Sequence, residues 1–158
     1  MSLTDRHKSL LGAAGRVIVG AILVYAGAAK AAGPTEEFAL IISYYQLLPR
    51  DMVMTVASFL PWLEVLVGWA LLLGVSRRAA ATAAGALFGG FLVALLSVLA
   101  RGIELPNCGC FGDSVHFTIP QALLFDSVML ALSWAALLHG GAFSLDKWVD
   151  GGYTPRGR

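Results

Sequence analysis

Charged residues are scarce in this chain, at 13% of 158 residues, whereas soluble domains carry about 25%. The formal net charge is only +1, so nothing in the charge balance favours nucleic acid as a partner. Apolar residues make up 58% of the chain, compared with roughly 45 to 50% in soluble domains. This composition indicates a membrane protein with the lipid bilayer as its solvent.

The chain also lacks the alternating polar and apolar pattern of a barrel strand. Its apolar excess falls in four windows instead, residues 10–32, 52–74, 79–100 and 118–139. Each window is close to the roughly 20 residues that an α-helix needs to cross the hydrocarbon core. We therefore predict an all-α fold, a polytopic four-helix membrane bundle formed by residues 10–139. Residues 1–9 and 140–158 are predicted to be a cytoplasmic N-terminal segment and a cytoplasmic tail.

The distribution of lysine and arginine predicts the orientation of the spans. Seven of these residues flank one side of the membrane and three flank the other, namely Lys30, Arg50 and Arg101. The richer side is expected to be cytoplasmic, which places both termini in the cytoplasm. The loop after the third span is then periplasmic, in the inner membrane of a bacterium.

Residues 33–49, between the first two spans, are too few to cross the bilayer. Thr35 is a candidate N-cap, two acidic residues follow it, and Pro49 closes the segment. This pattern predicts a short interfacial helix. Tyr44, Tyr45 and Trp62 are expected near the outer headgroups, either as part of an aromatic belt or as part of a binding site.

Glycines in the third span are predicted to support close packing. Gly85 and Gly89 follow Ala81 at small-xxx-small spacing, with Gly90 beside them. Such a stripe packs either within one bundle or between the subunits of a homo-oligomer, and both arrangements remain open.

The only two cysteines, Cys108 and Cys110, share one short loop. Residues two apart have α-carbons about 5.5 to 7 Å from each other, so the pair can form a disulfide only if the chain bends at Gly109. A strained and exposed disulfide of this kind is typical of exchange chemistry. Arg101 is expected to favour the thiolate, and His116 to accept a proton. A passive bridge and capture of a soft metal by the two thiolates are the alternatives.

Glu64 lies in the middle of the second span, where a carboxylate costs at least about 2.5 kcal/mol on insertion scales. It should therefore face the bundle interior, and we expect Lys30, Arg101 and Asp126 to form a polar cluster with it. This cluster either lines a quinone pocket or is a structural ion pair between Glu64 and Lys30. Asp126 is alternatively a solvated residue near the start of a helix.

Several short motifs follow one another along the chain, including residues 44–49 (YYQLLP), 60–64 (LPWLE) and 108–112 (CGCFG). Their order resembles that in the MauE branch of the DoxX-like membrane proteins. The resemblance implies a four-helix membrane protein that helps to mature periplasmic enzymes such as the disulfide-rich methylamine dehydrogenase, alongside a thioredoxin-like partner. It also implies kinship with quinone-linked thiol oxidases, which carry a second cysteine pair that this chain lacks.

These observations predict a membrane thiol-disulfide exchange protein that cycles Cys108 and Cys110 with a periplasmic thioredoxin-like partner. Electron transfer to quinone, with Glu64, Lys30, Tyr44 and Trp62 near the acceptor, is a further hypothesis. The alternative is a non-enzymatic assembly factor that holds its partner or a substrate enzyme at the bilayer and has a structural disulfide. Transport is disfavoured, because the chain lacks paired broken helices with inverted symmetry.

Overall fold

The protein is all-helical over the residues that the computed structural model describes, 3–103 and 118–139. Its helices there are α1 (Leu3–Ala32), α2 (Thr35–Tyr44), α3 (Arg50–Leu73), α4 (Arg77–Arg101) and α5 (Ile119–His139). Four of them, all except α2, are long and apolar enough to cross a membrane. The prediction of a polytopic bundle with a short helix after the first span is therefore confirmed, and the chain is a multi-pass membrane protein.

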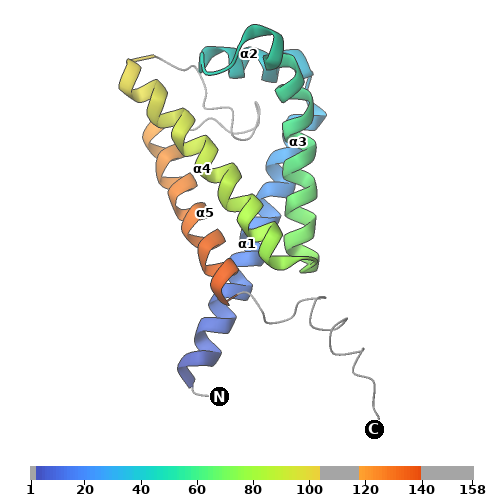
Figure 1. Cartoon of the computed structure of the whole chain (residues 1–158), viewed down its shortest axis with the longest axis vertical. Coiled ribbons are helices and arrows are strands. Elements are labelled where there is room, and N and C mark those ends of the chain that lie inside the picture. Colours follow the sequence, from blue (N-terminus) through green and yellow to red (C-terminus); the bar gives the residue numbers. More distant parts are fainter. Residues whose placement is uncertain (1–2, 104–117, 140–158) are drawn as a thin grey trace.

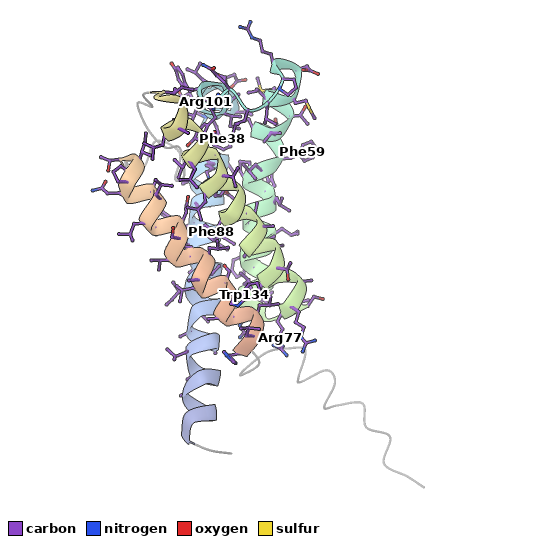
Figure 2. The ribbon with its side chains drawn as sticks, turned by 60° about the vertical axis from the view of Figure 1, so that its left-hand side comes forward. Phe38, Phe59, Arg77, Phe88, Arg101 and Trp134 are labelled. Carbon is purple, nitrogen blue, oxygen red and sulfur yellow. The ribbon has the colours of Figure 1, made fainter. Side chains whose placement is uncertain are left out.

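The four long helices form one bundle, and α2 lies across one end of it (Figure 1). The most extensive helix contacts join α1 to α3, α4 to α5, and α1 to α5. Between these helices lies the main core, in which Leu23, Leu71 and Phe88 are almost fully buried. Large apolar residues on the outer faces are exposed, as expected for surfaces that contact lipid; Figure 2 shows Phe59 of α3 pointing away from the bundle.

The crossing of α1 and α3 uses glycines of both helices. A Cβ atom placed on Gly68 would lie 2.7 Å from the Gly20 carbonyl oxygen, and one placed on Gly27 would lie 2.5 Å from the Pro61 oxygen. Only glycine allows the two backbones to approach this closely.

The predicted α4 stripe is divided. Ala81 is buried in the core, and a Cβ on Gly85 would lie 3.8 Å from Leu130 of α5, whereas a Cβ on Gly89 or Gly90 would meet nothing within 4 Å. Within the described residues, these two glycines do not bring helices into contact.

The ends of α2 differ from the sequence prediction. Pro34 is the N-cap, and Thr35 is already the first helical residue, so the expectation that Thr35 caps the helix is wrong. Pro34 takes this position because its carbonyl oxygen accepts the Glu37 N–H at 3.2 Å and its fixed φ suits extended backbone. The helix ends at Tyr44, and Pro49 is the N-cap of α3.

Candidate functional site

A buried ion pair joins the last turn of α1 to the middle of α3. The Lys30 Nζ atom donates to both carboxylate oxygens of Glu64, each at 2.7 Å. Lys30 is 4% exposed and Glu64 is 0% exposed. The expectation that Glu64 faces the bundle and pairs with Lys30 is therefore confirmed. The close approach at Gly27, one turn before Lys30, brings α1 near enough for this contact.

Two aromatic rings lie beside the Lys30 ammonium. Its nitrogen lies 5.6 Å from the centre of the Phe38 ring and 5.3 Å from the centre of the Phe91 ring. These rings come from α2 and α4. Together with Glu64 of α3, they place the Lys30 ammonium of α1 in contact with residues of three other helices. The negative faces of the rings attract the ammonium and help to offset its removal from water.

Asp126 of α5 lies on another side of the same lysine. It is 1% exposed, and with Lys30, Phe88 and Phe125 it lines a small cavity of about 10 Å³, no larger than a single water molecule needs. The alternative that Asp126 is a solvated residue near the start of a helix is wrong, because its side chain is buried inside the bundle, about two turns into α5. The structure thus pairs Lys30 with Glu64 and places Asp126 at the wall of a small cavity that Lys30 also lines.

Arg101 does not join this cluster. It is the last residue of α4 and is exposed, and its guanidinium donates to the backbone carbonyl of Tyr45. It also donates to the carbonyl oxygen of Ser97 at 3.0 Å and to the Ser97 hydroxyl at 3.2 Å. The prediction that Arg101 belongs to the polar cluster is wrong, because its end-of-helix position lets the side chain reach the end of α2. Figure 2 shows Arg101 at the α2 end of the bundle.

A larger cavity of about 320 Å³ lies between α2, α3 and α4. Its walls are apolar and include Phe38 and Ile42 of α2, Val56 and Leu60 of α3, and Gly90 and Phe91 of α4. Among the described residues, Lys30 is the only charged one that lines it. Sequence reasoning missed this cavity. One sequence feature pointed to it, a row of small residues on one face of α4, namely Ala86, Gly90 and Ala94. The same pattern also indicates helix packing.

The two aromatic residues expected near an acceptor lie outside this cavity. Tyr44 is 41% exposed and Trp62 is 65% exposed, and neither lines the cavity. Their positions on the outer surface suit an aromatic belt. Tyr45, the next residue along, is the one that lines the cavity.

Cys108, Cys110 and His116 lie outside the described residues. The chain leaves the described part after Ile103, which follows α4, and returns at Thr118, which precedes α5. Both points are at the end of the bundle where α2 and Arg101 lie (Figure 1). The roles of the two cysteines and of His116 therefore remain predictions.

The fold and the site together define a small polytopic helical membrane protein, with a buried ion pair beside an apolar cavity. Comparison of the sequence with known families gives a more particular assignment. The sequence model of the family described as methylamine utilisation protein MauE matches residues 8–139. The chain belongs to the MauE family.

Three curated relatives are named methylamine utilization protein MauE. The protein from Methylophilus methylotrophus is 37% identical over 90 residues, which cover 57% of this chain and 47% of the relative. The Paracoccus denitrificans protein is 29% identical over 120 residues, covering 76% and 64%. The Methylorubrum extorquens protein is 33% identical over 98 residues, covering 62% and 53%. The chain thus spans about half to two thirds of the lengths of these relatives. No solved structure matches it.

Proposed function

We propose that this protein is a membrane thiol-disulfide exchange protein that acts in the maturation of periplasmic enzymes, in the setting of methylamine utilisation. Cys108 and Cys110 are its reactive pair, and a periplasmic thioredoxin-like protein is its partner. The observation that carries the proposal is that the CGC loop, within the stretch matched by the MauE family, connects α4 to α5 at one end of a membrane bundle.

The proposed location is the bacterial inner membrane, with both termini in the cytoplasm and residues 104–117 in the periplasm. With four spans, the N- and C-terminal ends of the bundle lie on the same side of the membrane. The excess of lysine and arginine next to the spans on that side favours the cytoplasm. An oxidising periplasm would allow the two cysteines to form a disulfide between cycles.

The proposed exchange is reversible and needs no other reactant. A thiolate of the reduced partner attacks one sulfur of the Cys108–Cys110 disulfide, which forms a mixed disulfide and releases the other cysteine as a thiolate. The partner's second thiolate then attacks the mixed disulfide. The partner leaves oxidised, while Cys108 and Cys110 have gained two electrons and two protons as a dithiol. The same steps in reverse reduce the partner.

A second and separable part of the proposal is that a quinone reoxidises the dithiol. The quinone takes two electrons and two protons to become a quinol, and the Cys108–Cys110 disulfide re-forms. Because the chain has only these two cysteines, no second pair relays the electrons, and the quinone reacts with this pair directly. The cavity beside Lys30 supports this part of the proposal, since it offers space for a lipid-soluble molecule.

Replacing both cysteines by serine is expected to abolish exchange with a thioredoxin-like partner, because serine cannot form a disulfide. The measurement is oxidation of the reduced partner by reconstituted protein, with Ser114→Ala in the same loop as the control. A chain with only one of the two cysteines replaced should accumulate a mixed disulfide with the partner. If the double variant still supports maturation of the substrate enzyme, the assembly-factor alternative is correct.

Adding a quinone to vesicles that contain the protein and reduced partner is expected to make partner oxidation catalytic, at many turnovers per protein. Without quinone, oxidation should stop after about one partner per disulfide. The readout is partner thiol content together with quinol absorbance. A yield limited to one turnover in both conditions would remove the quinone part and leave thiol exchange standing.

A further inference from the structure

We propose that the cavity between α2, α3 and α4 binds a neutral, lipid-soluble molecule through a carbonyl oxygen that accepts a hydrogen bond from the Lys30 Nζ atom. This proposal deepens the quinone part of the proposed function and rests on it for the redox role of the ligand. Binding itself needs neither cysteine.

The size and lining of the cavity suit the apolar body of such a ligand. Its volume of about 320 Å³ lies at the lower end of the range for small-molecule sites, about 300 to 1,000 Å³. This is room for a ring and the first part of a hydrocarbon tail. The rings of Phe38 and Phe91 flank Lys30 on the cavity side and provide apolar surface beside the polar contact.

The Lys30 ammonium supplies one donor to the cavity. An ammonium carries three N–H groups, and its hydrogen bonds to Glu64 use two of them. The Lys30 side chain is 1% exposed, so in the proposed complex the Phe38 and Phe91 rings at the cavity wall move apart and the third N–H donates to the ligand oxygen. A carbonyl oxygen needs only this single donor, so no other polar wall residue is required.

The charges around Lys30 favour a neutral ligand over an anion. Glu64 already balances the lysine, and Asp126 lines the small cavity on another side of it. A carboxylate or phosphate in the larger cavity would lose its hydration and meet a lysine whose charge is already neutralised. A neutral carbonyl compound avoids that cost.

Gly90 keeps the cavity open. It lines the cavity, and a Cβ atom added there would meet nothing within 4 Å. Its neighbour Gly89 has equally open space but does not line the cavity. The two positions therefore form a matched pair, since a Cβ atom has open space at both, whereas only position 90 lines the cavity.

The test measures binding of a decyl-tailed benzoquinone to the full chain in phosphatidylcholine nanodiscs, in a Cys108→Ser, Cys110→Ser background. Gly90→Leu is expected to weaken saturable binding at least about tenfold, because the leucine side chain fills the volume that the ring requires. Gly89→Leu should leave the affinity within about twofold. Equal losses in the two variants, or no saturable binding by the parent chain, would overturn the proposal.

Competition with other ligands tests which class of carbonyl compound the cavity binds and whether the cavity prefers neutral molecules. If the methyl ester of decanoic acid displaces the benzoquinone, neutral lipid carbonyls share the site. If the ester does not displace it, the site is selective for quinones. Decanoate at pH 8 should compete poorly, and an affinity equal to that of the ester would refute the preference for neutral ligands. Binding is measured in a background that lacks thiols, and exchange is measured in the chain that keeps both cysteines. Binding without exchange would overturn the proposed function alone, and exchange without binding would overturn this inference alone.

Discussion

Replacing Glu64 by glutamine is expected to lower the free energy of unfolding by about 3 kcal/mol, because the change leaves the Lys30 ammonium buried without its counter-charge. The loss should fall at the low end for a broken buried pair, since the amide oxygen of glutamine still accepts a hydrogen bond. Unfolding in mixed micelles, followed by circular dichroism against increasing SDS, measures it. The geometry behind the expectation is the pair of 2.7 Å contacts between two buried side chains.

The matched control is Glu36→Gln, the same chemical change at an exposed position in the first turn of α2. Its effect should stay within about 0.5 kcal/mol. The double variant Lys30→Met, Glu64→Leu should recover most of the stability, because apolar side chains of similar volume remove both charges together. Equal losses in the Glu64→Gln and Glu36→Gln variants would show that the pair does not stabilise the bundle.

Replacing Gly27 by alanine is expected to destabilise the bundle by about 1 to 3 kcal/mol, the usual cost of overpacking. The added methyl group would lie 2.5 Å from the Pro61 carbonyl oxygen and 2.8 Å from a methyl group of Val65. Since the first of these atoms belongs to the backbone, α1 must move away from α3. The same displacement would draw Lys30 away from Glu64, one turn further along.

Gly89→Ala is the control for this prediction, because its new methyl group meets nothing within 4 Å. Alanine favours helix over glycine by about 1 kcal/mol, so this variant should be neutral or slightly more stable. The same SDS titration compares the two. Opposite signs at Gly27 and Gly89 would confirm that the glycines of α1, rather than those of α4, form the close crossing.

Some features of the site followed from single residues. A carboxylate in the middle of a span has to avoid lipid and find a partner, and Lys30 was a near cation at the correct end of the first span. The cost of burial therefore predicted that Glu64 needs a partner, but it left both Lys30 and Arg101 as candidate cations. The burial of Asp126 could not be predicted, because its side chain suits either a solvated helix start or the interior, and the rotation of α5 decides between them.

Other features depended on where the helices cross. The stripe in α4 and the glycines of α1 and α3 have similar spacing in the sequence, yet only the α1 and α3 glycines lie at a backbone contact. Arg101 was expected to turn inward, but the end of α2 provides a carbonyl acceptor at the rim of the bundle. The packing of α2 on α3 determines that acceptor's position, which no local pattern encodes.

The amino-acid sequence by itself determined that this is a four-span helical membrane protein with a short fifth helix and a charged residue that must be paired inside. It does so because the thickness of the bilayer and the cost of burying polar groups act on each segment separately. Only the tertiary structure decided that Lys30 lies between Glu64, two phenylalanine rings and a cavity. That arrangement depends on the rotation and crossing of neighbouring helices, which in lipid are set by shape-dependent contacts between residues far apart in the chain.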